Sequence, residues 1–161
     1  MNAQVEALIK DQINKEFYSA YLYLAFSNYY HCENLDGFGH WFEVQAREEQ
    51  EHAMKLLKYL QDNSVKVKLE AIAAPAVSFS SHREPLAAAL KHEQYVTSLI
   101  HAVYKQARES DDFRACQFLE WFVAEQGEEE KNTGDLIAKF DMLGGDAKGL
   151  YLLNAELKNR G

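Results

Sequence analysis

Two pairs of potential metal-binding side chains stand three residues apart in this chain. Glu49 and His52 form one pair, and Gln126 and Glu129 form the other. Residues at this spacing lie one turn apart on the same face of an α-helix, so both members of a pair can reach one ion. A Glu-x-x-His pair that faces the inside of a helical bundle is a typical half-site for two metal ions. Each pair predicts a metal site if its helix turns it towards a core.

The residues around the first pair indicate that it does face a core. Glu49 and His52 share one helical face with a mostly apolar stripe at steps of three and four, made of Phe38, Trp41, Phe42, Gln45, Leu56 and Leu60. Glu16 and Glu93 interrupt similar stripes in two other segments. Burying an unpaired carboxylate costs on the order of several kcal/mol, so such groups stay protonated or bind cations. The alternative is that these are exposed or hydrogen-bonded residues on helices whose faces the pattern misplaces.

The two halves of the chain repeat this arrangement. Glu16 precedes Glu49 by 33 residues, and Glu93 precedes Gln126 by the same interval. Each half therefore predicts a helical hairpin with one inward Glu and one inward pair. Two such hairpins around a pseudo-twofold axis would bring together five ligands, namely Glu16, Glu49, His52, Glu93 and Glu129. Four carboxylates and one imidazole favour iron or manganese over Cu(I).

Further acidic residues and one tyrosine would lie beside this centre. Glu48, Glu125 and Glu128 could form a third, weaker ion site or simply a solvated helix face. Tyr23 stands two turns after Glu16 on the same helical face. Its hydroxyl could bond a ligand or its ring could donate an electron to an oxidised metal. The alternative is an ordinary core tyrosine.

Four long helices are predicted to carry these residues. They run over residues 5 to about 30, from the turn at 34–37 to about 62, from Glu84-Pro85 to the turn at 110–112, and from there to about 143. Gly144 and Gly145 end the fourth helix, and residues 146–158 could form a short fifth helix outside the bundle. The prediction is an all-α protein, with one domain over residues 1–161.

The segment between Asn63 and Glu84 has no helical periodicity. Residues 65–69 alternate as a strand would, but they have no obvious partner. A helix of about 25 residues is roughly 38 Å long, whereas about twenty extended residues can reach roughly 66 Å. This segment can therefore return along the whole bundle and leave the second and third helices parallel, as in bundles with one long crossover.

Composition excludes several classes of partner. The net charge of −8 argues against nucleic acid and anionic membranes as partners. Cys32 and Cys116 form no C-x-x-C pattern, which fits a reducing compartment. We find no basic segment followed by an apolar core at the start, and no apolar stretch long enough to span a bilayer. These features predict a cytoplasmic protein.

Several stretches resemble the bacterial non-haem ferritins, and the resemblance covers nearly the whole chain. They are Asn14-Lys15-Glu16, Tyr21-Leu22-Tyr23-Leu24, Arg47-Glu48-Glu49-Gln50-Glu51-His52-Ala53, Ala89-Leu90-Lys91-His92-Glu93 and Trp121-Phe122-Val123-Ala124-Glu125-Gln126. The resemblance implies a ferritin-like four-helix bundle with one long crossover and a short fifth helix. It also implies a homo-oligomeric cage of 24 subunits that stores ferric mineral, and a ferroxidase centre that oxidises Fe(II) with O2 or peroxide.

The resemblance also implies roles for individual residues. The first iron would be bound by Glu16, Glu49 and His52. The second would be bound by Glu49, Glu93 and Glu129, with Gln126 assisting nearby. An additional iron site would use Glu48, Glu125, Glu128 and Glu129. Tyr23 matches the tyrosine beside the centre and is the candidate catalytic residue. Gly127 departs from the family, which often has a larger side chain there, and could loosen the fourth helix.

Related proteins offer alternatives. Bacterioferritin binds haem through a Met directly after the bridging Glu, where this chain has Gln50, so haem is not expected. A rubrerythrin would need a Cys-rich domain that this chain lacks. A storage protein with little oxidation of its own would lack ligands that are present here. A di-manganese enzyme or a substrate oxidase could use similar ligands and stays open.

Overall fold

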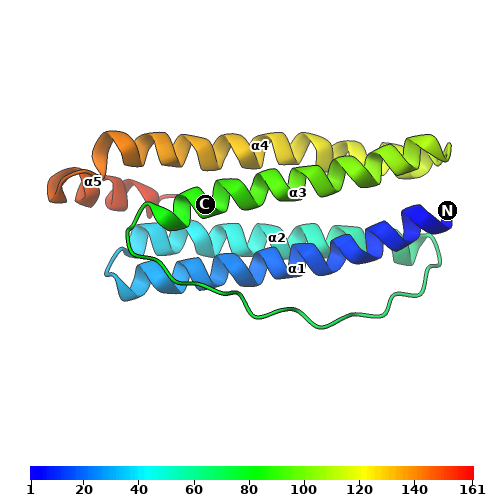
Figure 1. Ribbon diagram of the computed structural model, residues 1–161, viewed down its shortest axis with the longest axis horizontal. Helices are drawn as coiled ribbons and strands as arrows, with labels where there is room; N and C mark the ends of the chain where they lie inside the picture. The colour runs from blue at the N-terminus through cyan, green and yellow to red at the C-terminus, as the bar shows by residue number, and fades with distance from the viewer.

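The structure is a computed structural model that describes residues 1–161, and it contains five helices and no strand. The helices are α1 (Ala3–Cys32), α2 (Asp36–Asp62), α3 (Glu84–Glu109), α4 (Phe113–Leu143) and α5 (Ala147–Leu157). The first four lie side by side in a bundle, and α5 packs at one end of it (Figure 1). The predicted all-α fold is confirmed. None of the helices combines the length and apolarity that crossing a membrane requires.

Local sequence signals determine where the helices begin and end. α1, α4 and α5 begin after Asn2, Asp112 and Asp146, whose side-chain oxygens accept backbone N–H groups of the first turn. The chain leaves α1 and α3 through Asn34 and Asp111, which adopt left-handed φ values of 60° and 53°. Asn and Asp tolerate this conformation better than most other residues that carry a Cβ. Short turns can therefore reverse the chain after both helices.

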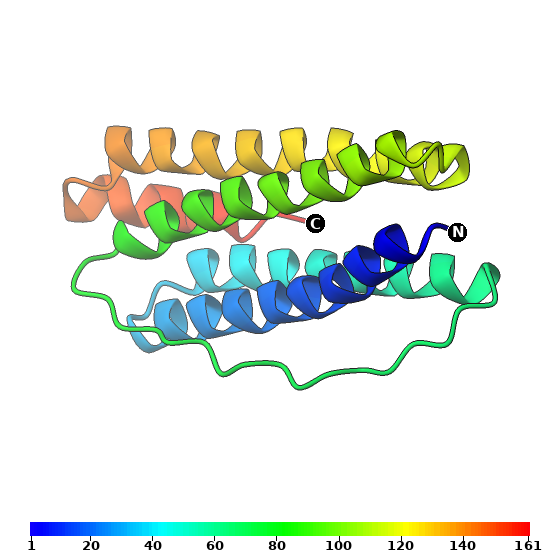
Figure 2. The same cartoon turned by 45° about the vertical axis from the view of Figure 1, so that its right-hand side comes forward.

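The long connection after α2 determines the topology. Residues 63–83 run outside the bundle along α1, so α2 and α3 start at the same end of the molecule (Figures 1 and 2). Asn14 on α1 holds this segment by donating from Nδ2 to the carbonyl of Ala71 at 3.0 Å. Residues 65–69 form no strand because no neighbouring strand exists. Val65 and Val67 instead pack against the apolar core.

A polar layer divides the apolar core of the bundle into two clusters. One cluster of 14 buried residues includes Tyr23, Phe42 and Leu136. The other, of 13 buried residues, includes Ile13, Leu56 and Leu119. Glu16, Glu49, Glu93 and Glu129 lie on the four helices between these clusters. The two apolar clusters therefore pack on either side of the polar layer and hold it in place.

Candidate metal centre

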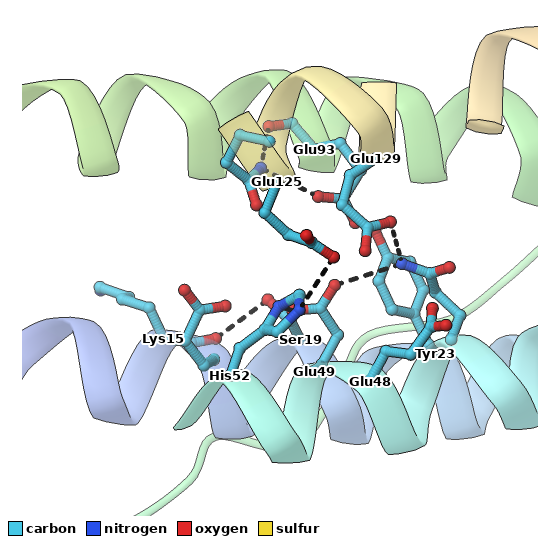
Figure 3. A network of polar contacts seen from close by, with 12 residues as sticks. Lys15, Ser19, Tyr23, Glu48, Glu49, His52, Glu93, Glu125 and Glu129 are labelled. Atoms are coloured by element: carbon cyan, nitrogen blue, oxygen red, sulfur yellow. Dashed lines mark hydrogen bonds and ion pairs between the residues drawn. The ribbon is translucent and has the colours of Figure 1, made fainter. Parts of the chain in front are cut away.

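Each long helix turns at least one acidic side chain into the middle of the bundle. Glu16 comes from α1, Glu49 and His52 from α2, Glu93 from α3 and Glu129 from α4. All five side chains are buried, with at most 3% of any residue exposed. Figure 3 shows Glu49 and His52 facing Glu93 and Glu129 across the centre. The structure thus brings together the five residues on which the sequence interpretation rests.

Their ligand atoms form groups small enough to surround single cations. In each group, one ligand atom from every residue lies within 4.8 Å of the others. The three groups are Glu16–Glu49–His52, Glu49–Glu93–Glu129 and His52–Glu125–Glu129. Glu49 belongs to the first two groups, so one carboxylate is common to two candidate ion sites.

Glutamine side chains hold the carboxylates in place. Gln12 Nε2 donates to Glu16 Oε1 at 2.9 Å. Gln45 Nε2 lies 3.3 Å from Glu49 Oε1 and 2.5 Å from Glu129 Oε2, so one amide donates to two acids on different helices. The remaining acid of the centre, Glu93, accepts from two further donors. Gln126 Nε2 lies 3.2 Å from Glu93 Oε2, and the hydroxyl of Tyr23 donates to Glu93 Oε1. Each carboxylate therefore has a fixed neutral donor.

Burial dominates the electrostatics of the centre. It raises the pKa of Glu16, raises that of Glu49 well above its ordinary value, and raises the pKa of Glu93 to about 7 and of Glu129 to about 8. Neighbouring carboxylates add to the effect at Glu49 and Glu129. Glu16 Oε2 has no hydrogen-bond partner although it is buried. A divalent cation would replace the protons and satisfy this oxygen, so the residues fit a metal ion.

Tyr23 is both a core aromatic residue and a neighbour of the centre. It is fully buried and packs edge-on against the Phe26 and His92 rings. Its hydroxyl donates to Glu93 Oε1. Burial, reinforced by the charges of Glu93 and Glu49, raises the pKa of Tyr23 well above its ordinary value. The phenol therefore stays protonated and keeps its hydrogen bond to Glu93.

The acids predicted for a third ion site lie in different surroundings. Glu125 is half-buried and reaches towards His52, with Oε1 at 3.6 Å from Nε2 (Figure 3). Glu48 instead accepts a hydrogen bond from Arg160 at 2.8 Å, and Glu128 is exposed. Of the four acids, only Glu125 and Glu129 share a candidate group, and His52 is its third member. An ion site that uses Glu48 and Glu128 stays a prediction.

Comparison with known proteins places this architecture in a family. The family model of the ferritin-like domain matches residues 6–143. A bacterial non-heme ferritin of Campylobacter jejuni is 34% identical over 159 residues, which are 99% of this chain and 95% of that protein. The chain belongs to the non-haem ferritin family. A probable bacterial non-heme ferritin-like protein of Haemophilus influenzae is 36% identical to this chain. The match covers 99% of this chain and 96% of the Haemophilus protein.

Solved structures agree with the family assignment. The novel open pore ferritin of the hyperthermophilic archaeon Archaeoglobus fulgidus superimposes with a TM-score of 0.97 at 36% identity, covering 100% of this chain and 98% of that chain. The predicted ferritin-like bundle with a short fifth helix is thereby confirmed for this ferritin.

Sequence reasoning overlooked two of the residues that support the centre. Gln12 and Gln45 were not assigned roles, although each stands four residues before a candidate ligand, Glu16 or Glu49. This i, i+4 spacing is the signal that could have identified them. Gly127 lies within α4, which continues unbroken through it, and whether this glycine loosens the helix stays a prediction.

Proposed function

We propose that this ferritin stores iron and oxidises Fe(II) at a two-ion centre in the middle of its bundle. The observation that carries the proposal is that Glu49 belongs to two buried ligand groups at once. One group combines it with Glu16 and His52, and the other with Glu93 and Glu129. The family assignment and relatives named as ferritins support iron as the substrate.

In this proposal the carboxylates exchange protons for substrate ions. Two Fe(II) ions enter the two groups, and the protons that Glu49, Glu93 and Glu129 hold because of burial are released. Each Fe(II) gives up one electron. The electron pair and two protons reduce O2 to hydrogen peroxide, or reduce hydrogen peroxide to water. Proximity of the two ions lets one oxidant receive both electrons.

The remaining polar residues of the centre orient the ligands and flank the reaction. Gln126 and Tyr23 both donate to Glu93 and so keep its carboxylate turned towards the second group. We assign Tyr23 the further role of a one-electron donor to oxidised iron, with its phenol proton passing to Glu93, whose Oε1 it already contacts. A third ion would bind between Glu125, Glu129 and His52, and Glu48 and Glu128 would join it if their side chains turned inward.

Storage requires a compartment, which we propose to be a homo-oligomeric cage of 24 subunits in the cytoplasm. Fe(III) leaves the carboxylate-rich centre and accumulates there as mineral, without haem, nucleic acid or membrane as a partner. A closed assembly of identical chains of 18.5 kDa would have a mass of about 440 kDa. Light scattering of the purified protein checks this mass, and a monomer or dimer in dilute solution would contradict the cage.

Anaerobic titration of the metal-free protein with Fe(II), followed by O2, tests the proposed reaction. The wild type should bind at least two Fe(II) per chain and oxidise them far faster than buffer. Glu49→Gln should lose this fast phase, because it removes the ligand that both groups share. Glu51→Gln makes the same chemical change at an exposed position of α2 and should behave as the wild type.

Two results would contradict the proposal. Oxidation no faster than in buffer, with iron still accumulating, would make the centre a storage sink without catalysis. Slow oxidation that Glu49→Gln does not change, together with tight Mn(II) binding, would instead favour a di-manganese protein.

A further inference from the structure

The end of the chain returns to the metal centre after α5. Arg160 is mostly buried, with 18% of its side chain exposed, and its guanidinium lies 4.1 Å from the ring centre of Trp41. Nη1 donates to the carbonyl of Trp41 at 2.9 Å. Nη2 donates to Gln45 Oε1 at 2.9 Å and to Glu48 Oε2 at 2.8 Å. The guanidinium thus joins three residues of α2 that all lie within eight residues of Glu49.

The packing of α5 determines where this arginine lies. Leu153 and Leu157 are buried in the core cluster around Tyr23. Asn154 Oδ1 accepts the backbone N–H groups of Gly37 at 2.8 Å and of Phe38 at 3.3 Å, which caps the start of α2. A Cβ at Gly37 would lie 1.7 Å from the backbone carbonyl oxygen of Asn154, so this close approach requires glycine. α5 is therefore attached to α2 and delivers the residues that follow it to a defined place.

The contact with Gln45 connects Arg160 to the centre. A guanidinium only donates hydrogen bonds, so it must meet the oxygen of the Gln45 amide. The amide nitrogen then has to point the other way, towards Glu49 Oε1 and Glu129 Oε2. Without Arg160 the amide could rotate by half a turn and present its oxygen to the two acids. Ionised carboxylates also favour the amide nitrogen because they only accept, and Arg160 adds the contact that holds the Gln45 oxygen away from them.

We propose that Arg160 is a positioning residue for the ion site formed by Glu49, Glu93 and Glu129, and that it acts through the Gln45 amide. The inference rests on the proposed two-ion centre. It also predicts an asymmetry between the two sites. Two of the three acids in this site accept from Gln45, whereas in the other site only the shared Glu49 does, and Glu16 and His52 make no hydrogen bond to Gln45 or Arg160. Loss of Arg160 should therefore affect one ion more than the other.

Anaerobic titration of the metal-free, assembled protein with Co(II) measures the two sites without any oxidation step. Co(II) absorbs visible light with an intensity and a wavelength that depend on its ligand geometry. In Arg160→Gln, the Co(II) in the Glu49–Glu93–Glu129 site should bind about tenfold or more weakly and absorb differently, while binding of the Co(II) in the Glu16–Glu49–His52 site should change much less. Arg83→Gln is the matched control, because it removes an exposed arginine whose partner is Asp141 at the far end of α4.

A charge-conserving variant and a double-mutant cycle separate positioning from other roles. Arg160→Lys should restore binding only partly, because an ammonium group cannot make the three directed contacts of the guanidinium. Gln45→Leu alone should lower the Co(II) affinity of the Glu49–Glu93–Glu129 site by about the same factor as Arg160→Gln does. Combining the two should weaken it no further, since both changes remove the same link.

Specific outcomes would overturn the inference. One such outcome is that Arg160→Gln binds both Co(II) ions as tightly as the wild type. Another is that the variant binds both ions more weakly by the same factor and has a lowered melting temperature, which indicates a structural role. An undiminished effect of Arg160→Gln in the Gln45→Leu background would show that Arg160 does not act through the amide. Failure of the wild type to bind two Co(II) would instead overturn the two-ion centre itself.

Discussion

Glu49 on α2 and Gln126 on α4 occupy equivalent positions in the two helical hairpins, yet they contact different groups. Glu49 belongs to both central ligand groups. Gln126 is a neutral amide instead, and its Nε2 donates to Glu93 Oε2 at 3.2 Å and to Thr97 Oγ1 at 3.3 Å. The next equivalent pair differs too, because α2 has His52 where α4 has Glu129.

This difference makes the centre asymmetric. A carboxylate at position 126 would add a further acid to a cluster in which burial already raises the pKa of Glu93 to about 7 and of Glu129 to about 8. An amide there donates a hydrogen bond and adds no charge. The proposed centre thus has one shared carboxylate, one candidate site with an imidazole and one with oxygen ligands only.

The largest expected effect comes from replacing the residues at these equivalent positions one at a time. Glu49→Gln should slow O2-dependent Fe(II) oxidation by more than about 100-fold, because both groups lose a ligand. Gln126→Leu should slow it only about tenfold, because Glu93 loses one of its two side-chain donors while the four carboxylates and the imidazole all remain. Stopped-flow absorbance measures both rates. Equal losses in the two variants would remove the distinction between the hairpins.

Restoring the symmetry should destabilise the metal-free protein. Gln126→Glu places an additional acid beside Glu93 and removes a donor, which should cost about 3 kcal/mol of unfolding free energy at neutral pH. Divalent ions should recover part of this loss, because the new carboxylate is a potential ligand. Gln117→Glu makes the same change on an exposed face of α4 and should be nearly neutral. Denaturant unfolding at one fixed protein concentration compares the variants.

The raised carboxyl pKa values predict that the metal-free protein loses stability as pH rises. Glu93 and Glu129 have folded pKa values of about 7 and about 8, above the ordinary 4.5, so the native state binds more protons than the unfolded state between these limits. Their stabilising contribution is complete below pH 4.5 and disappears as pH rises through 7 and 8. The melting temperature should therefore fall between about pH 6.5 and pH 8.5.

This pH range also avoids an opposing effect. Burial lowers the pKa of His92 to about 4 from 6.5, so that residue contributes a stability loss only as pH falls below 6.5. Replacing Glu93 and Glu129 together by Gln should flatten the decline at higher pH. A melting temperature that rises towards pH 8.5 in the metal-free wild type would contradict the proposed proton-holding centre.

The smallest effect is expected at the position that follows Gln126. Gly127 on α4 is equivalent to Gln50 on α2, is exposed, and has no atom within 4 Å of where its Cβ would lie. Gly127→Ala should therefore stabilise the protein by about 0.5–1 kcal/mol through helix propensity alone. Thermal unfolding measures the gain, and Fe(II) oxidation should be unchanged. A loss of oxidation rate would mean that flexibility of α4 at Gly127 serves the centre.

Helical periodicity alone predicted most of the architecture. The stripes that include Glu16, Glu49 and Glu93 faced a core, because residues three and four apart share a helix face whatever the rest of the chain does. The interval of 33 residues between Glu16 and Glu49, repeated in the second half, placed the inward acids at one level of the bundle. The long connection could be recognised because it lacks this periodicity.

Tertiary structure alone decided which neighbours these acids have. Glu48 and Glu125 look alike in sequence, yet one meets Arg160 at 2.8 Å and the other approaches His52 at 3.6 Å. Arg160 is 112 residues from Glu48 and 115 from Gln45, and its contacts depend on how α5 packs against the start of α2. Periodicity determines the face on which a side chain lies, because that is a property of one helix. The partner it meets there depends on the packing of separate segments, which no local pattern encodes.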